Sequence, residues 1–437
     1  MESRRLYRNL MLMVAAVVLT VVPASAQVNI QCPCDHNGDA DCLDIVSTGP
    51  PSGRYNEPAD AAALGVVCKH LTGGDGFAVM ADGTPRYMFG FSDVTGVPAA
   101  QVMQDGLLAA EWPAPTIAVD QYDKFYLTLS NVGMVVRPDL FDPHSVHFHG
   151  FPQSSTIFDG LPESGVAINQ GASLTYFYDL AEPGTFIYHC HVEATEHMQM
   201  GMLGNLYVNA AQSWLGAPGV PAGNPAECDV PGDQYPGVPC GYAYNDEDGT
   251  TAYDRVFPLQ LGSWDPDFHD ASWNVQPLPF ALMWDRYPVI NGRGYPDTIV
   301  PGTLPRQPID PDDGVTDLNG PTSSQSVSSL ITATQGDKVL LRLSNLNVTE
   351  VHTLSSPSIP MEVVAIDAKE LKADDGTKLH YFTNSVTLGG GMTTDVILDT
   401  TGVPVGEYYL YAADVQFLAN YTENEDLGGM MTKIVIN

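Results

Sequence analysis

Six of the eleven histidines in this 437-residue chain fall in two short segments. The first is His144-Ser145-Val146-His147-Phe148-His149-Gly150, and the second begins at His189-Cys190-His191 and runs on through His197 to Met202. Imidazole and thiolate groups prefer soft transition metals. One isolated histidine would mean little, because most histidines are surface or hydrogen-bonded residues. Six of them gathered around a cysteine predict a metal centre.

Two of these stretches are His-x-His pairs, and a strand would place both members of each pair on one face. Successive side chains of a strand point to opposite faces, so residues two apart lie on the same side. The pairs therefore form an outward-facing set of four imidazoles, which are His147, His149, His189 and His191.

A second set of ligands has the opposite parity. Cys190 lies between the members of one pair, so it points into the domain when they point out. His144 has opposite parity to His147 and can point inward as well. Two further candidates follow Cys190 on the next loop. The inward set is then His144, Cys190, His197 and Met202.

The inward set contains two imidazoles, one thiolate and one thioether. Those are the ligands of a blue-copper electron-transfer site, in which methionine is the weak axial ligand. Zinc is the competing metal, but a structural zinc site uses four Cys or His ligands and no thioether. Met202 therefore favours copper.

The rest of the chain predicts β-domains that position these ligands. Gly (41) and Pro (34) are plentiful, Lys plus Arg number only 18, and 44% of residues are hydrophobic, a composition that favours turns and strands. Alternating strand-like runs separated by turns predict a sandwich over residues 76–210 and a second one over 251–437. Residues 211–250, rich in Pro, Gly, Asp and Asn, are a predicted linker, and 27–75 are a Cys-rich N-terminal extension.

The first 26 residues have the pattern of a cleaved signal peptide: three arginines, an apolar run from Leu10 to Val22, and Ala24-Ser25-Ala26. The run is too short for a membrane span, and no later segment is long enough. We therefore expect a secreted protein, periplasmic or extracellular.

Six of the seven cysteines suit disulfides in an oxidising compartment, which leaves Cys190 as a free thiol.

The remaining features concern charge and calcium. Residues 35–41, Asp-His-Asn-Gly-Asp-Ala-Asp, have oxygen ligands at alternate positions, as a Ca²⁺ loop would. They lack the Glu that ends the loop of an EF-hand, so a solvated acidic turn is the preferred interpretation. A formal net charge of −34 argues against nucleic acid or an anionic membrane as a partner.

In combination, His-x2-His-x-His-Gly and His-Cys-His followed by His-x4-Met resemble the copper motifs of multicopper oxidases, the family of laccases and metal oxidases. The resemblance implies two cupredoxin-like Greek-key β-sandwich domains. It also implies type 1 copper at the inward set and half of a trinuclear type 2/type 3 cluster at the outward set. The loop from Cys190 to His197 is slightly longer than is usual in laccases. Residues 288–293 and 359–367 resemble the copper-free middle domain of three-domain members, so the resemblance covers about residues 76–437.

The second domain departs from that pattern. A full cluster in this family takes matching His-x-His pairs from another domain. Outside the two motifs the histidines are isolated: His36, His70, His269, His352 and His380. A cluster between the two domains of one chain is therefore expected to be incomplete. We hypothesise a homo-oligomer in which two first domains face each other, because a two-fold contact pairs the same patch on both subunits. The alternative is a monomer or trimer whose outward histidines hold at most one copper, with His352 from a neighbouring chain as a further candidate ligand.

Three functions follow from these motifs. The first is an oxidase that takes single electrons from a phenolic or metal-ion reductant at type 1 copper and reduces dioxygen to water. The second is an enzyme like copper nitrite reductase, although His147 stands where that family has a catalytic Asp. The third is a blue-copper electron carrier without oxidase activity.

Overall fold

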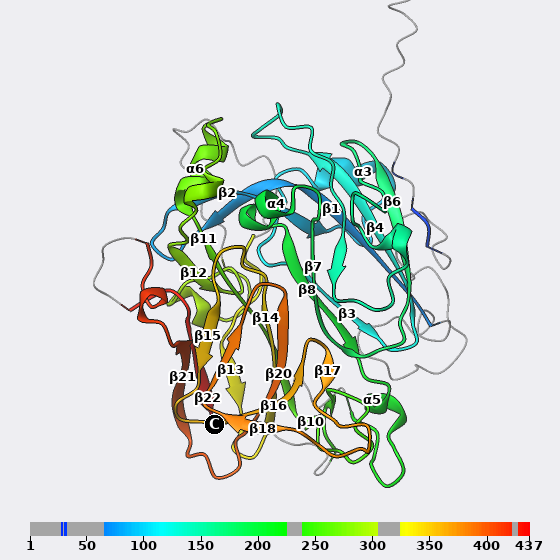
Figure 1. Ribbon diagram of the computed structural model, residues 1–437, viewed down its shortest axis with the longest axis vertical. Helices are drawn as coiled ribbons and strands as arrows, with labels where there is room; N and C mark the ends of the chain where they lie inside the picture. Colours follow the sequence, from blue (N-terminus) through cyan, green and yellow to red (C-terminus); the bar gives the residue numbers. More distant parts are fainter. Residues whose placement is uncertain (1–27, 29, 33–64, 225–237, 305–323, 422–426) are drawn as a thin grey trace, which may run out of the picture.

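The computed structural model describes residues 28, 30–32, 65–224, 238–304, 324–421 and 427–437. The described chain forms two β-sandwiches with a few short helices (Figure 1), so the predicted all-β class is confirmed. The predicted signal peptide, the calcium-like loop and three cysteines (Cys34, Cys42 and Cys228) lie outside the described residues.

Two four-stranded sheets make up the first sandwich, in the orders β2-β1-β4-β6 and β3-β8-β7-β5. The strands of the first sheet are β1 (Val66–Val79), β2 (Pro85–Asp93), β4 (Lys124–Gly133) and β6 (Ser173–Asp179). Those of the second sheet are β3 (Ala114–Asp120), β5 (His147–His149), β7 (Gly184–His189) and β8 (Leu203–Asn209). Helices α3 (Ala99–Asp105) and α4 (Ala194–Met200) lie in connections between strands. Aromatic side chains such as Phe89, Phe125 and Tyr178 fill the space between the sheets.

A seven-stranded and a five-stranded sheet form the second sandwich. The larger sheet contains β11 (Arg255–Trp264), β12 (Tyr287–Ile290), β14 (Lys338–Asn345), β16 (Met361–Ile366), β17 (Lys369–Glu370), β18 (Tyr381–Thr383) and β20 (Met392–Asp399). The smaller one contains β13 (Ile331–Ala333), β15 (His352–Ser355), β19 (Ser385–Leu388), β21 (Gly406–Ala412) and β22 (Met431–Ile436). Its core is aliphatic, with Leu341, Val363 and Leu410 fully buried.

Short elements make up the remaining connections. Helix α5 (Gln212–Leu215) and the small sheet of β9 (Gly241–Tyr242) and β10 (Ala252–Tyr253) join the two sandwiches, and α6 (Pro266–Trp273) leaves the second sandwich after β11. In Figure 1, α6 lies at the top of the molecule beside β2 of the first sandwich. One-turn helices occur at η1 (Thr156–Phe158), η3 (Phe280–Leu282), η4 (Asp297–Ile299) and η6 (Val415–Phe417).

The two sandwiches share a buried interface. Trp112 of the first stacks on Trp264 of the second, with ring centroids 3.7 Å apart and planes 8° from parallel. The buried Arg342 on β14 donates to the Thr185 hydroxyl of β7 at 2.9 Å. Thr185 in turn donates to Asp395 at 2.5 Å, so the Arg342 cation is paired with polar partners rather than left alone in the interface.

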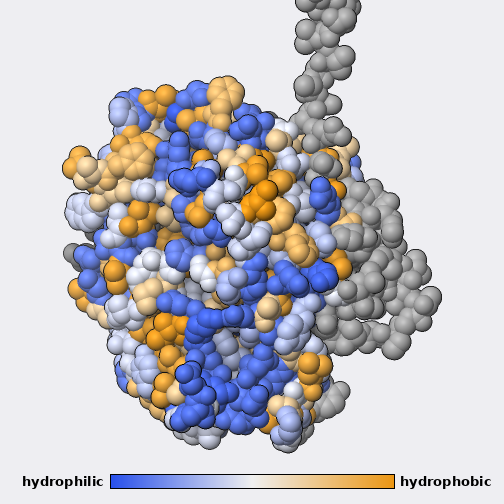
Figure 2. Space-filling view, turned by 45° about the vertical axis from the view of Figure 1, so that its right-hand side comes forward, coloured by the Kyte–Doolittle hydropathy of each residue, from blue (hydrophilic) through white to orange (hydrophobic). Residues whose placement is uncertain are grey.

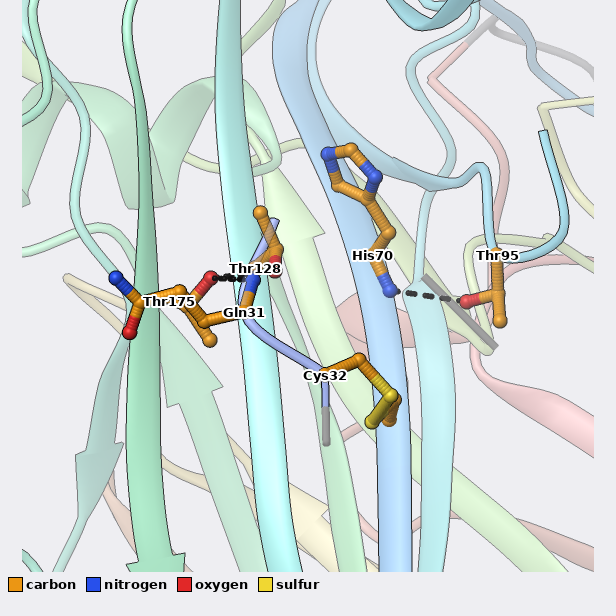
Figure 3. The surroundings of a disulfide bond; sticks show 7 residues. Gln31, Cys32, His70, Thr95, Thr128 and Thr175 are labelled. Atoms are coloured by element: carbon orange, nitrogen blue, oxygen red, sulfur yellow. Dashed lines mark hydrogen bonds between the residues drawn. A yellow bond between two sulfur atoms is a disulfide. The ribbon is translucent and has the colours of Figure 1, made fainter. Parts of the chain in front are cut away.

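A disulfide ties the N-terminal segment to the first sandwich (Figure 3). Cys32 bonds to Cys68 on β1, and the neighbouring Gln31 amide donates to the Thr175 hydroxyl of β6 at 3.2 Å. Cys240 is also disulfide-bonded, whereas Cys190 is free and buried. These findings agree with the predicted use of cysteine in an oxidising compartment.

The surface mixes polar and apolar side chains. On the face shown in Figure 2, hydrophilic residues gather in the lower part, and hydrophobic patches alternate with hydrophilic ones above them. Among the described helices, none has the length and apolar character needed to cross a membrane.

Candidate metal centre

The pairing of β5 with β7 brings the two His-x-His motifs together. In this antiparallel register His147 lies opposite His189, and Phe148 lies opposite Tyr188. Phe148 and Tyr188 are buried in the core of the first sandwich. The histidines beside them therefore share the other face of the sheet, as strand alternation predicts.

The four outward histidines form one cluster. The ring of His147 has its centroid 5.2 Å from that of His189 and 5.0 Å from that of His191, and His149 lies 5.9 Å from His189. Ligand atoms of His147, His149 and His189 all lie within 4.8 Å of one another. One metal ion can bridge nitrogens at that spacing, and the nearby His191 offers a fourth.

Backbone carbonyls orient two of these rings. The Nδ1–H of His147 donates to the carbonyl of Asp159 at 2.6 Å, and that of His189 donates to the carbonyl of Cys190 at 2.8 Å. Each ring therefore keeps Nε2 unprotonated and free to bind a metal, which is the usual arrangement of metal-binding histidines. Burial lowers the pKa of His147 and His149 and lowers that of His189 to about 3, so these rings are neutral near pH 7.

The inward set lies on the core side of this sheet, where Cys190 directly follows β7. The sulfur of Cys190 is 3.1 Å from Nδ1 of His197 and 3.9 Å from Nδ1 of His144, and all three side chains are fully buried. Burial opposes ionisation of the Cys190 thiol, but His197 and His144 outweigh it and hold the pKa of the thiol well below its ordinary value. The site therefore favours a thiolate, the form that binds metal.

Met202 completes this set. It is fully buried, and its carbonyl accepts a hydrogen bond from the Cys190 amide at 3.1 Å. Both Met202 and His144 lie against Gly73 of β1. A Cβ atom at Gly73 would come 2.9 Å from the His144 ring and 3.4 Å from the Met202 methyl group, so only glycine leaves room for both ligands.

The donor set fits copper. Two imidazoles, a thiolate and a thioether lie together in a buried site, which is the mixed nitrogen and sulfur donor set that suits copper. Nδ1 of each ring faces the sulfur, so a copper ion would be held by Nδ1 of both imidazoles and by the two sulfur atoms.

The connection that carries His197 and Met202 is partly helical. Helix α4 occupies Ala194–Met200, with Glu193 before it and Gly201 after it in the left-handed region at φ 48° and 116°. The slightly longer loop expected from the sequence is thus folded into about two turns of helix. His197 lies inside the helix and Met202 follows it.

Sequence reasoning missed two acidic neighbours of these sites. Asp142 lies 3.8 Å from Nε2 of His197, and together with Glu193 it forms a third group able to hold a cation. The nearby His197 imidazole holds the pKa of Asp142 below its usual range. Burial lowers the pKa of His197, but Cys190 and Asp142 more than offset this and raise it to about 10. The signal was present in the order Asp142-Pro143-His144, but only the fold turns Asp142 toward His197.

The isolated histidines lie elsewhere. His352 is buried in the second sandwich, 3.4 Å from the Ser263 hydroxyl and against Phe417. His70 contacts Ser130 inside the first sandwich, and His380 lies between Glu362 and Glu370. None of these three belongs to a metal-capable group in the part of the chain that the structure describes, and His36 lies outside it.

Comparisons with known proteins agree with this geometry. Two family models, both described as multicopper oxidase, match residues 95–213 and 289–435. Laccase-5 of Arabidopsis thaliana is 26% identical over 311 residues, 71% of this chain and 41% of the relative. The iron transport multicopper oxidase FET3 of Gibberella zeae is 37% identical over 89 residues, 19% of this chain and 13% of the relative. The chain thus spans less than half the length of either relative.

Solved structures show the same fold. The blue copper oxidase from Nitrosomonas europaea superimposes with a TM-score of 0.55 at 21% identity, over 84% of this chain and 85% of the other. The copper nitrite reductase from Nitrosomonas europaea superimposes with a TM-score of 0.50 at 16% identity, over 85% and 93% of the two chains. These likenesses support the predicted pair of cupredoxin-like domains.

Proposed function

Because the chain belongs to the multicopper oxidase family, we propose that it is an exported oxidoreductase that passes single electrons from a small reductant to dioxygen. The observation that carries this proposal is the placement of Cys190. Its sulfur faces His144 and His197, while His189 and His191 on either side of it belong to the outward cluster. A single tripeptide therefore connects two candidate metal centres.

We assign the two centres by their ligands. The inward set, His144, Cys190, His197 and Met202, is the proposed type 1 site, and the outward set, His147, His149, His189 and His191, is the proposed part of a type 2/type 3 cluster. Copper, when bound, supplies reversible one-electron chemistry. The ligands of the inward set are buried, so they would keep water away from a copper ion held there.

The reductant that suits this site is a metal cation. Asp142 and Glu193 lie next to His197, on the side of the ring that faces away from Cys190. Their carboxylates would bind Fe(II) or Mn(II), and the net charge of −34 would attract a cation over longer distances. A phenol would gain no comparable contact from these two residues.

A complete cluster needs more imidazoles than one chain brings together here. We propose that two chains place their outward histidines face to face, since a two-fold axis would double the set. Of the four outward histidines, His149 is the exposed one. Light scattering with and without copper, on the parent and on the double variant His147→Ala/His149→Ala, tests this. Copper should dimerise the parent only, and a parent that stays monomeric when fully loaded rules the shared cluster out.

Copper content per chain, measured together with electron paramagnetic resonance and oxygen consumption, tests the oxidase. For an oxidase we expect more than two coppers, counted per chain or per site shared between chains. We also expect oxygen uptake that depends on the reductant. One blue copper and no oxygen uptake would favour an electron carrier, a function consistent with a second domain whose described histidines lie away from the cluster. Two coppers with nitrite reduction would favour the nitrite-reductase-like alternative.

Export is supported by the Cys32–Cys68 disulfide, because such bonds persist in oxidising compartments. We propose that residues 1–26 are the signal that directs the chain there. N-terminal sequencing of the protein recovered from the periplasm or medium should begin at Gln27.

A further inference from the structure

Gln199 links the second sandwich to the helix that carries a ligand of the proposed type 1 site. This residue lies on α4, between the ligands His197 and Met202, and is almost fully buried. Its backbone carbonyl meets Nε2 of His269 at 2.9 Å, and its side-chain amide donates to Asp285 at 3.2 Å. Both partners belong to the part of the chain that follows the linker.

His269 connects α4 to a strand of the first sandwich. It lies on α6, is buried, and also brings Nδ1 to the carbonyl of Tyr87 on β2 at 2.6 Å. Its ring packs on Trp264 with centroids 4.3 Å apart. One imidazole thus contacts both a strand of the first sandwich and the helix that carries a proposed copper ligand, while its own helix follows β11 of the second sandwich.

Asp285 is an equally fixed partner. Its carboxylate is buried and accepts from the Ser263 and Thr349 hydroxyls at 2.9 Å each and from the Asn347 amide at 2.8 Å. Those three donors hold Asp285 in one orientation, so its contact with Gln199 has a defined position. A carboxylate acceptor also makes this a stronger hydrogen bond than one between neutral groups.

These contacts reach the ligands through short chain segments. The Met202 amide donates to the carbonyl of His197 at 2.8 Å, so the two ligands move with the helix end between them. Trp264 packs against the residue that ends this helix, because a Cβ atom at Gly201 would lie 3.1 Å from the Trp264 ring. A shift of Gln199 would therefore change where the Met202 sulfur lies relative to Cys190.

We propose that His269 and Asp285, from the domain that carries no type 1 ligands, are positioning residues of the type 1 site and act through Gln199 to place Met202. The inference rests on the proposed function, because it needs copper at the inward set. The axial ligand tunes a blue-copper site, so loosening the helix should change the colour and the reduction potential without removing a ligand.

His269→Phe tests the first contact, since it keeps a ring beside Trp264 and removes both polar contacts. His269→Gln is the conservative rescue, because its amide can still donate to one carbonyl. Gln199→Leu removes the contact with Asp285 and leaves His269 in place. His380→Phe is the matched control: it removes a histidine that is held by Glu362 and Glu370 and contacts no copper ligand.

Each copper-loaded variant is measured by its visible spectrum, electron paramagnetic resonance, reduction potential and copper affinity. Outer partners of metal ligands typically contribute about 10–100-fold to metal affinity. We expect His269→Phe and Gln199→Leu to lower copper affinity about tenfold, alter the ratio of the charge-transfer bands and shift the potential. His269→Gln should lie closer to the parent, and His380→Phe should match it.

The failures are distinguishable. A parent that shows no blue band with copper refutes the proposed type 1 site, whatever the variants do. A blue parent whose His269→Phe and Gln199→Leu variants keep its spectrum and potential refutes the positioning role. If His269→Phe does not fold, as judged by circular dichroism of the metal-free protein, Gln199→Leu decides the question alone.

Discussion

The imidazole of His149 lies directly against Gly391, a residue of the second sandwich. A Cβ atom at Gly391 would come 2.8 Å from both Cε1 and Nε2 of that ring. The second domain therefore forms a wall of the outward cluster even though none of its described histidines belongs to that cluster. The close approach depends on the absence of a side chain at this position.

Gly391→Ala should weaken metal binding at the outward cluster and leave the blue site intact, because the new methyl group displaces His149. Copper titration followed by electron paramagnetic resonance would show fewer non-blue coppers and an unchanged blue band. Gly376→Ala is the control: Gly376 has φ +87°, close to the +91° of Gly391, and nothing lies within 4 Å of its added methyl group. Equal losses in both variants would attribute the effect to backbone strain.

Cys190→Ser should abolish the blue colour, because thiolate-to-Cu(II) charge transfer needs the sulfur. The fold should survive, with a change of about 1–2 kcal/mol in the free energy of unfolding of the metal-free protein. Visible absorption and urea unfolding check both points. A Cys190→Ser protein that stays blue with copper would show that the type 1 assignment is wrong.

His189→Ala or His147→Ala should retain the blue band and lose oxygen consumption by more than about 100-fold, since each removes a ligand of the outward cluster. Stopped-flow reduction of the blue band by the reductant should still occur, and only its reoxidation by dioxygen should fail. Oxygen uptake equal to that of the parent would leave the oxidase without its proposed site.

Asp142→Asn should lower kcat/KM for Fe(II) about tenfold, because it removes a negative charge beside His197; tenfold corresponds to ~1.4 kcal/mol of transition-state stabilisation. The kcat/KM for a neutral phenol is the control, because it reports how far the substitution disturbs His197 itself. This kcat/KM should change much less than that for Fe(II). Parallel losses for both reductants would argue against a cation site at Asp142.

Acid should destabilise the metal-free protein through its buried neutral histidines. Burial lowers the pKa of His70 and of His352 from 6.5 to about 4 in the folded state. Between these values the unfolded chain binds protons that the folded chain does not, so stability falls as the pH drops from about 6.5 towards 4. For His352 alone the loss between pH 7 and 4.5 is on the order of 2 kcal/mol.

Urea unfolding of the metal-free protein at these two pH values measures that loss. His352→Gln removes the titrating group from the second sandwich and should make stability less dependent on pH. The same comparison with His70→Gln reports on the first sandwich. A variant whose pH dependence equals that of the parent would show that the histidine it lacks is not a buried neutral group.

The division of the ligands into two sets could be predicted from the sequence alone. It depends on the alternation of side chains along a strand, which is a local property of the backbone. On a strand, Cys190 therefore had to point to the face opposite that of its neighbours His189 and His191. In the same way, His147 and His149 had to share one face. The all-β class followed in the same way from alternation and turn residues.

Only the tertiary structure decided which distant groups surround those ligands. Asp142, in the connection between β4 and β5, lies beside His197 of α4, and His269 reaches Gln199 across 70 residues of sequence. Gly391 meets His149 because the two sandwiches pack together. No periodicity in the sequence predicts such contacts, because they depend on how whole sheets and helices pack. The type of a single residue does not indicate which residue of another domain will lie beside it.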